Sequence, residues 1–172
     1  MMIFDNIKEA ATALGWPRQP EDAPQAPVEA LEQGLAGVLS FCPYEDHYRS
    51  SLGWVDAMDQ AWVITREGWH PVRASYSWRS TDRHEPDVER QGETVAEAIA
   101  RLRSPIMGVA VYSRVHDDFH PSDNGEGWTL YLPEPVKDDR LRKIRRRVED
   151  RLRKAPAETI LAVAALLEVK LD

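Results

Sequence analysis

The sequence contains a single cysteine, Cys42, so a disulfide within the chain is excluded. The lack of disulfides is typical of a reducing compartment and favours a cytoplasmic location. The first residues have neither the basic nor the apolar segment of a secretory signal peptide. The longest apolar run, Ile160 to Leu167, is too short to cross a bilayer. We therefore expect a soluble protein with no membrane partner.

Sequence signatures of the common enzyme classes are also missing. The chain has no phosphate-binding glycine loop, no dinucleotide fingerprint, no serine-hydrolase elbow and no paired Cys-x-x-Cys site. An enzyme does not need any of these motifs, but their absence favours a protein that acts by binding. We expect no cofactor.

The charge of the chain is acidic and uneven. Acidic residues outnumber basic ones by 29 to 22, which gives a formal net charge of −7. Ten basic and four acidic residues lie between Lys137 and Lys154, so the rest of the chain carries −13. With 172 residues, 42% of them hydrophobic, the chain is long enough for one globular domain with its own core. We therefore expect one acidic domain, residues 1–172, with one basic segment.

The first 40 residues show the periodicity of two helices. Ile3, Ile7 and Leu14 recur at helical spacing, and Gly15 follows as a helix-ending residue. Residues 28–39 show a second helical pattern, weakened by two glycines. Between them, residues 16–27 contain four prolines and are predicted to be a connector.

The middle of the chain predicts a sheet, with its core at residues 61–132. Residues 61–66 and the alternating run 72–79 are expected to form an antiparallel hairpin, whereas residues 42–60 have no clear pattern. Thr94 and Glu97 form a capping box that begins a helix, which Pro105 ends. Two further strands, 107–115 and 128–132, are expected to be joined through a long loop, 116–127.

Two more helices are predicted at the end of the chain, over residues 136–154 and 157–171. They would form a C-terminal helical hairpin, whose narrow apolar seam could also pair with a second copy in a homodimer. The predicted order is αα-ββ-α-ββ-αα. This order gives an α+β fold, with a four-stranded, mostly antiparallel sheet packed by helices.

The loop after residue 115 holds the most concentrated candidate ligands for a metal. His116, Asp118 and His120 could bind a divalent ion that activates water, which would make the protein a metal-dependent hydrolase. However, Pro121 and Gly125 indicate a loop, where His-x-x-x-His spacing does not bring both rings to one side. A solvated hairpin loop also explains this composition.

The basic segment offers a nucleic-acid binder as a second alternative. Many of its cations have an acidic residue four positions away, as expected of a solvated helical face. An acidic chain repels phosphate, and no aromatic residue interrupts the run to stack on bases. Nucleic acid is therefore a less favoured partner. The residues that would carry this function are Arg142, Lys143, Arg145 and Arg146.

Two weaker catalytic hypotheses depend on single pairs of residues. Cys42 and His47 could act as nucleophile and base, although a lone cysteine before a proline is more often a small buried residue. Paired carboxylates could serve in acid–base chemistry, but exposed acids are the ordinary expectation in an acidic chain. These pairs are Glu45 with Asp46 and Glu85 with Asp87.

A local resemblance concerns the strand that starts near Tyr76 and the segment Gly92-Glu93-Thr94-Val95-Ala96-Glu97-Ala98-Ile99. This strand–GxTxxEA–helix unit resembles that of HicB-type antitoxins and of small phage proteins of the αβα-sandwich kind. The similarity covers fewer than thirty residues. It implies a small accessory protein of a phage or mobile element that acts by binding, and it assigns no functional residue.

The favoured hypothesis is a non-enzymatic, acidic module that binds another protein. Such a module could act as an inhibitor or immunity protein that blocks a basic or nucleic-acid-binding surface of its partner. Six tryptophans are many for this length, and those in uncertain segments could contact a partner. The residues expected at this surface are Asp87, Glu89, Glu93, Asp117, Trp54 and Trp69.

Overall fold

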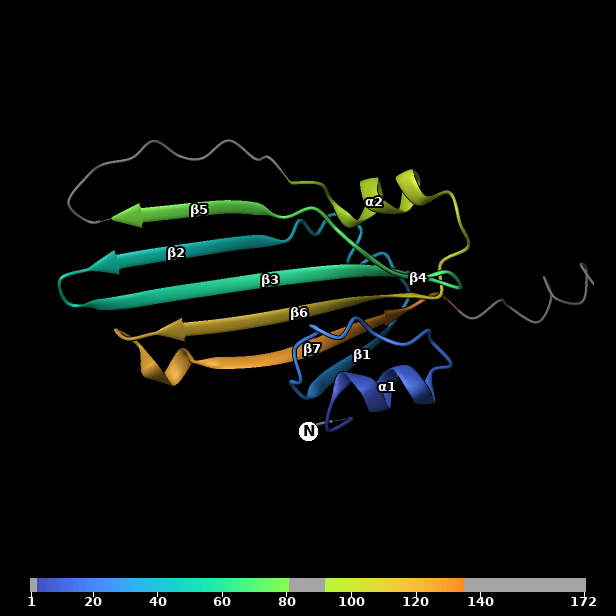
Figure 1. Cartoon of the computed structure of the whole chain (residues 1–172), viewed down its shortest axis with the longest axis horizontal. Coiled ribbons are helices and arrows are strands. Elements are labelled where there is room, and N and C mark those ends of the chain that lie inside the picture. The colour runs from blue at the N-terminus through green and yellow to red at the C-terminus, as the bar shows by residue number, and fades with distance from the viewer. Residues whose placement is uncertain (1–2, 81–91, 135–172) are drawn as a thin grey trace, which may run out of the picture. The chain divides into compact units, whose positions relative to one another are not determined.

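The computed structural model describes residues 3–80 and 92–134 of the chain, all within one compact unit that spans residues 1–134 (Figure 1). Strands dominate these residues. Its helices are α1 (Ile7–Ala13), α2 (Val95–Leu102) and a short 3₁₀ turn, η1 (Pro121–Asp123). Its strands are β1 (Val28–Gln33), β2 (Tyr44–Ser50), β3 (Gly53–Thr65), β4 (Gly68–Pro71), β5 (Ser75–Ser80), β6 (Gly108–Asp117) and β7 (Gly125–Leu132).

The described strands form one mixed sheet in the order β1-β7-β6-β3-β2-β5, and β4 pairs with β3. Strand β3 is the longest, with 13 residues. It pairs with β6 along residues 55–64, with β2 along residues 53–58 and with β4 along residues 62–65. The β1–β7 and β2–β5 pairs are parallel, and the others are antiparallel. The long central strand β3 therefore joins the strands β6, β7 and β1 on one side to β2 and β5 on the other.

One region of the sheet is packed on both faces. Side chains alternate between the faces of a strand, so Ile64 and Val63 of β3 enter different clusters. The cluster on one face, here called the α1 face, contains α1, the connector 16–27 and Trp128. The cluster on the other, the α2 face, contains α2 and neighbouring residues of β3 and β6. The core thus consists of two layers, one on each side of this part of the sheet.

Helix α1 forms where the sequence predicts a helix, but it begins later. Asn6 caps its first turn by accepting a hydrogen bond from the Glu9 amide at 3.0 Å. Ile3 and Phe4 instead form backbone hydrogen bonds with Val28, at the start of β1. Gly15, at φ 65°, turns the chain into the connector, which forms no helix or strand, as predicted.

The capping box that predicts α2 is confirmed. The Glu97 amide donates to Thr94 Oγ1 at 3.2 Å, and the Thr94 amide donates to Glu97 Oε2 at 2.6 Å. The capping box thereby satisfies two of the backbone amide donors at the start of the helix. Val95 and Ala98 are fully buried against the sheet, so the cap positions the apolar face of the helix on its core.

The predicted α+β fold is wrong, because strands replace a helix and the unassigned segment. Val28 and Leu31 have helical spacing, yet they pair in parallel with Trp128 and Leu130 of β7. Val28 is fully buried there, and Gly34 at φ 93° follows the strand. Long-range pairing with β7 outweighs the local helical pattern. The described chain is a mostly-sheet fold rather than the predicted order αα-ββ-α-ββ-αα.

The predicted pairing of strands is only partly correct. The turn at Gly68 forms, but the partner of β3 beyond it is the short β4 rather than the alternating segment. That segment becomes β5 and pairs in parallel with β2, within residues 42–60 that had no clear pattern. The β6–β7 hairpin is confirmed, with a shorter connection than predicted. The predicted helices at 136–171 lie outside the described residues.

Candidate functional site

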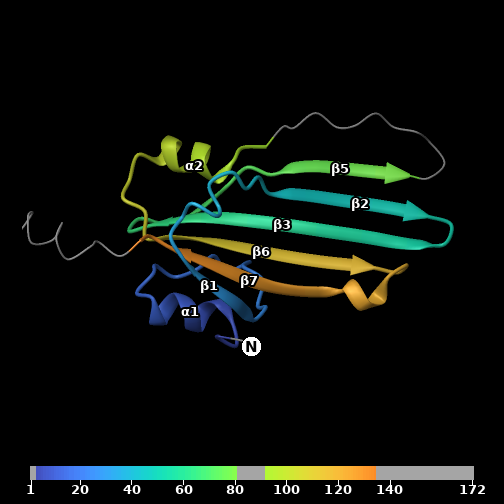
Figure 2. The same ribbon diagram turned by 180° about the vertical axis from the view of Figure 1, so that it is seen from behind.

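Part of the sheet extends beyond both α-helices of the described chain. In two opposite views, β2, β5 and the adjoining ends of β3 and β6 continue away from α1 and α2 (Figures 1 and 2). We call this part the distal sheet: residues 44–50, 53–60, 75–80 and 112–117, with the loop 118–124. Unlike the packed region, its first β3 residues are all only partly buried. The distal sheet is therefore a part of the described fold that neither α-helix covers (Figures 1 and 2).

The α2 face of the distal sheet carries a group of apolar side chains. Val55 and Val115 have the same alternation as the core residues of their strands that face α2, and Tyr48 pairs directly with Val55. Phe119 lies with its ring centroid 6.4 Å from that of Tyr48. Val115 is 37% exposed and Phe119 38%. We call these four residues the distal patch.

Hydrogen bonds from backbone amides to the Asp117 carboxylate fix the loop that carries Phe119. Asp117 Oδ1 accepts hydrogen bonds from the amides of Phe119 at 2.7 Å and His120 at 3.0 Å. Partial burial opposes ionisation of Asp117, but the amide donors of His120 and Phe119 outweigh it and hold the pKa of its carboxyl below the usual value. The Asp117 carboxylate, at the end of β6, therefore positions Phe119 in the loop.

A glycine makes room for this loop against the β2–β3 turn. Asp118 Oδ2 accepts a hydrogen bond from the Trp54 amide at 2.8 Å. A Cβ on Gly53 would lie 2.8 Å from the Asp118 Cβ and 3.5 Å from the Phe119 Cζ. The first distance is shorter than atoms of this kind tolerate, so Gly53 permits the close approach that places Phe119 near Tyr48.

Carboxylates border the distal patch. Asp46 and Asp59 share the α2 face with it, Asp117 ends β6 beside it, and Asp118 belongs to its loop. Asp59 Oδ1 accepts a hydrogen bond from Ser113 Oγ at 2.6 Å. Asp46 Oδ1 is buried and has no hydrogen-bond partner within the described ranges. The surface is therefore apolar at its centre and acidic around it.

The α1 face of the distal sheet carries an ion network instead. Asp56 lies between an arginine and a histidine: its Oδ2 is 2.7 Å from Arg114 Nη2, and its Oδ1 is 3.0 Å from His47 Nδ1. The ring of His47 lies 5.5 Å from that of Tyr76 and 6.2 Å from that of Trp54. An aspartate can orient a histidine base in this way, but here Arg114 shares the carboxylate. We interpret the network as a link between β2, β3 and β6.

Tyr112 borders this network and donates a hydrogen bond to Glu126 Oε2 at 2.6 Å. Burial, together with this bond to a carboxylate, raises the pKa of Tyr112 to about 12. The hydroxyl therefore stays protonated at neutral pH. It serves as a donor that ties β6 to β7 and is not poised to act as a base.

The candidate metal ligands pair with different carboxylates instead of converging. His116 Nε2 lies 3.2 Å from Asp118 Oδ1, and His120 Nδ1 lies 3.4 Å from Asp117 Oδ2. No group of three or more His, Cys, Asp or Glu side chains is arranged to hold a metal ion in residues 3–80 and 92–134. The geometry of these pairs therefore gives no support to the hydrolase alternative.

The predicted tryptophan contacts fall in two different places. Trp54 lies on β3 in the distal sheet, on the face that holds His47. Trp69 belongs to the packed region, where its Nε1 donates to the Pro17 carbonyl at 2.8 Å and its ring packs on Trp16. Only Trp54 is placed where a partner could reach it without opening the core.

The predicted acidic residues are likewise separated. Glu93 binds Arg101 at 2.7 Å, and the hydrogen bond from Arg101 lowers the pKa of its carboxyl. Asp117 lies beside the distal patch. The other predicted surface residues lie outside the described ranges: Asp87, Glu89, Arg142, Lys143, Arg145 and Arg146.

The Cys42–His47 pair is not supported by the contacts of its members. Cys42 Sγ has a 3.8 Å contact with the carbonyl of Pro43, whereas His47 Nδ1 faces Asp56. Neither residue contacts the other in these interactions. The arrangement of a nucleophile hydrogen-bonded to its base is therefore not formed.

The distal patch was missed because its strands have no apolar–polar alternation. Both faces of residues 44–60 carry polar side chains, so a period of two does not show in hydrophobicity. One signal was available: Phe119 is an isolated aromatic residue in a loop of charged and turn-forming residues. An apolar residue is informative when it stands alone among charged and turn-forming residues.

Comparison with known proteins gives no family for this chain: no family model, no curated protein and no solved structure matches it. Within the described ranges, neither α-helix has the length and apolar character that crossing a membrane requires. A functional conclusion must therefore come from the site itself.

Proposed function

We propose that this protein is a non-enzymatic module that binds a basic surface of another protein through the distal patch and its carboxylates. One observation carries the proposal. Of the six large hydrophobic side chains that are exposed in the described residues, Val115 and Phe119 belong to the distal patch, and Leu52 lies in the nearby β2–β3 turn. Exposed apolar groups gathered in one region are typical of interaction sites.

The charge around the patch supports a basic partner. Asp59, Asp117 and Asp118 place formal negative charge beside the apolar side chains, and the whole chain carries −7. Complementary charge speeds encounter with a basic surface and disfavours acidic partners. Apolar contacts at the centre with charges at the rim are the usual arrangement of a protein interface.

The same chemistry supports an inhibitory role. A basic protein surface that accepts carboxylates is also suited to phosphates, so an acidic module bound there would exclude nucleic acid. An inhibitor or immunity-type protein of a phage or mobile element would work in this way. We include this role in the proposal because it explains an acidic surface on a chain without a recognisable catalytic motif.

Affinity purification of the full-length tagged protein from its native host tests the proposal. The wild-type protein is compared with the V115S/F119S double variant and with a control, Leu39→Ser. Leu39 is also 38% exposed but lies in the loop after β1. We expect one basic protein to be recovered in stoichiometric amount with the wild type and the control, and to be lost with the double variant.

Titration of the purified partner then provides the decisive measurement. The double variant should increase the dissociation constant by a factor of about 30 or more, since the loss of even one central interface residue costs roughly 2 kcal/mol. Raising the salt concentration should weaken binding further. Equal affinity of the double variant and the wild type would refute the proposal. Self-association that the same substitutions abolish would instead assign the patch to a second copy.

A further inference from the structure

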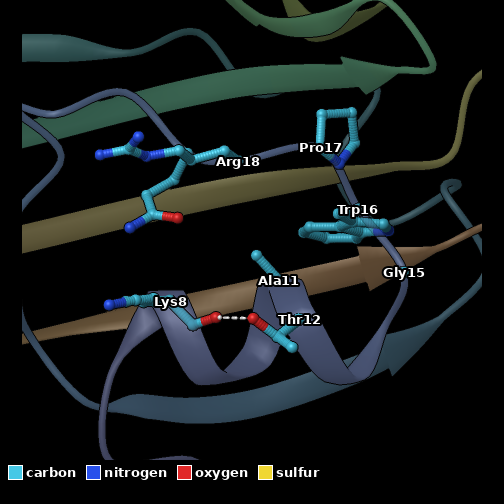
Figure 3. Close-up of a pocket in the computed structure, with 8 residues that line it drawn as sticks. Lys8, Ala11, Thr12, Gly15, Trp16, Pro17 and Arg18 are labelled. Atoms are coloured by element: carbon cyan, nitrogen blue, oxygen red, sulfur yellow. Dashed lines mark hydrogen bonds between the residues drawn. The ribbon is translucent and has the colours of Figure 1, made fainter.

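A cleft separate from the distal sheet lies between α1 and the connector that follows it (Figure 3). Its volume is about 490 Å³. This volume lies within the range of sites that bind small molecules. Lys8 and Thr12 of α1 line one side, and residues 15–19 line the other. The proposed protein-binding function makes no use of it.

The charges that line the cleft have one sign. Among the described residues that line it, only Lys8 and Arg18 carry a charge, in a chain where acidic residues outnumber basic ones by 29 to 22. Arg18 contacts Glu21 at 3.3 Å, but the two side chains are 81% and 85% exposed. An exposed ion pair of this kind is weak, so the guanidinium can exchange Glu21 for another anion.

The apolar wall of the cleft is formed in advance. Trp16 is only 8% exposed, and its ring packs edge-on against Trp69 at 5.7 Å. Gly108 lies against the indole, where any Cβ would clash with it. The connector is held by the hydrogen bond from Trp69 Nε1 to the Pro17 carbonyl. A ligand would therefore meet a wall that needs no further ordering.

The polar and apolar groups lie at different ends of the cleft. Figure 3 shows the side chains of Lys8 and Arg18 extending toward one end, while the ring of Trp16 lies toward the other. The Thr12 hydroxyl donates to the Lys8 carbonyl at 2.9 Å, which fixes its orientation. The arrangement separates a cationic end from an aromatic end.

We propose that this cleft binds a small organic anion: a carboxylate held by Lys8 and Arg18, attached to a flat apolar ring that lies against Trp16. Charge-assisted hydrogen bonds from an ammonium and a guanidinium are the strong contacts that a carboxylate can make. The exposed edge of the indole, together with Pro17, supplies the apolar contact area. The ligand is thus an aromatic carboxylate, and its site is independent of the distal patch.

Titration of the full-length protein with 2-naphthoate tests this proposal, with isothermal calorimetry and amide NMR as readouts. We expect a dissociation constant on the order of 1 mM, as for a ligand of fragment size. Amide resonances of Thr12 and Gly15 should shift. Two comparison compounds separate the contributions: 2-naphthamide lacks the charge and acetate lacks the ring, and each should bind at least fivefold more weakly.

Charge-removing variants place the site. Lys8→Gln and Arg18→Gln should each weaken 2-naphthoate binding about fivefold, because each removes a charge-assisted contact. Arg66→Gln makes the same charge change at the exposed β3–β4 turn and should have no effect. The V115S/F119S variant should bind normally, which separates this proposal from the proposed function. Undiminished binding to the K8Q/R18Q variant, equal binding of 2-naphthamide, or no binding at 10 mM would each overturn it.

Discussion

Asp56 of β3 accepts a hydrogen bond from Arg114 of β6 at 2.7 Å, on the face of the distal sheet opposite the distal patch. The two side chains are 17% and 37% exposed, so the pair is partly withdrawn from water. The other oxygen of Asp56 lies close to His47, but it accepts no well-aligned hydrogen bond among the described residues. Arg114 is therefore the stronger partner of this carboxylate.

The variant Asp56→Asn should destabilise the fold by about 1–3 kcal/mol, because it leaves a partly buried guanidinium without its counter-charge. A loss below that of a fully buried pair is expected, since Arg114 is partly solvated. Urea unfolding followed by tryptophan fluorescence measures the change. Asp123→Asn, at an exposed site in the β6–β7 loop, is the matched control. Equal stability of both variants would show that the ion network contributes nothing.

The variant Gly53→Ala should destabilise the fold by about 1–3 kcal/mol, because its Cβ would meet Asp118 at 2.8 Å. It should also weaken binding of the partner, since Phe119 follows Asp118. Gly125→Ala is the control for stability, because nothing lies within 4 Å of a Cβ there. Thermal unfolding and partner titration measure the two effects. Normal partner binding by Gly53→Ala would show that the position of this loop does not affect the proposed binding function.

The variant Thr94→Ala should lose about 1 kcal/mol of stability, because it removes half of the capping box at the start of α2. Thr94→Ser, which keeps the hydroxyl, should retain most of this stability. Chemical denaturation of the three proteins measures the difference. An effect as large for serine as for alanine would mean that the methyl group, and not the cap, matters at this position.

Patterns between near neighbours in the sequence predicted α1 and α2. They missed β1, which forms through pairing with a strand far along the chain. The Thr94–Glu97 capping box lies within four residues, so the sequence alone reveals it. By contrast, Val28 joins a strand because Trp128 lies beside it, one hundred residues later in the chain. A helical spacing of apolar residues carries no information about such a neighbour.

The candidate site was harder to predict for the same reason. The distal patch combines Tyr48, Val55, Val115 and Phe119, which the register of three strands brings together. Register follows from the hydrophobic pattern only where one face of a strand is buried. In the distal sheet both faces are partly exposed. Residues 44–60 therefore show no apolar–polar alternation that would predict the strands β2 and β3.

Titration of Tyr112 provides the last prediction. Its pKa of about 12 lies above the ordinary value of 10.0, so the folded state favours the protonated hydroxyl. This contribution to stability is complete below pH 10 and is lost as the pH rises from 10 to 12. The free energy of unfolding should therefore fall over this window by roughly 2 kcal/mol more in the wild type than in Tyr112→Phe.

Absorbance at the tyrosinate band gives an independent readout of the same group. The chain has five tyrosines. One of them should ionise near pH 12, and this late step should disappear in Tyr112→Phe. Glu126→Gln should shift the step toward lower pH, because it removes the negative charge that opposes ionisation while an acceptor oxygen remains. A late step that persists in Tyr112→Phe would assign the raised pKa to a different tyrosine and would contradict the proposed β6–β7 contact.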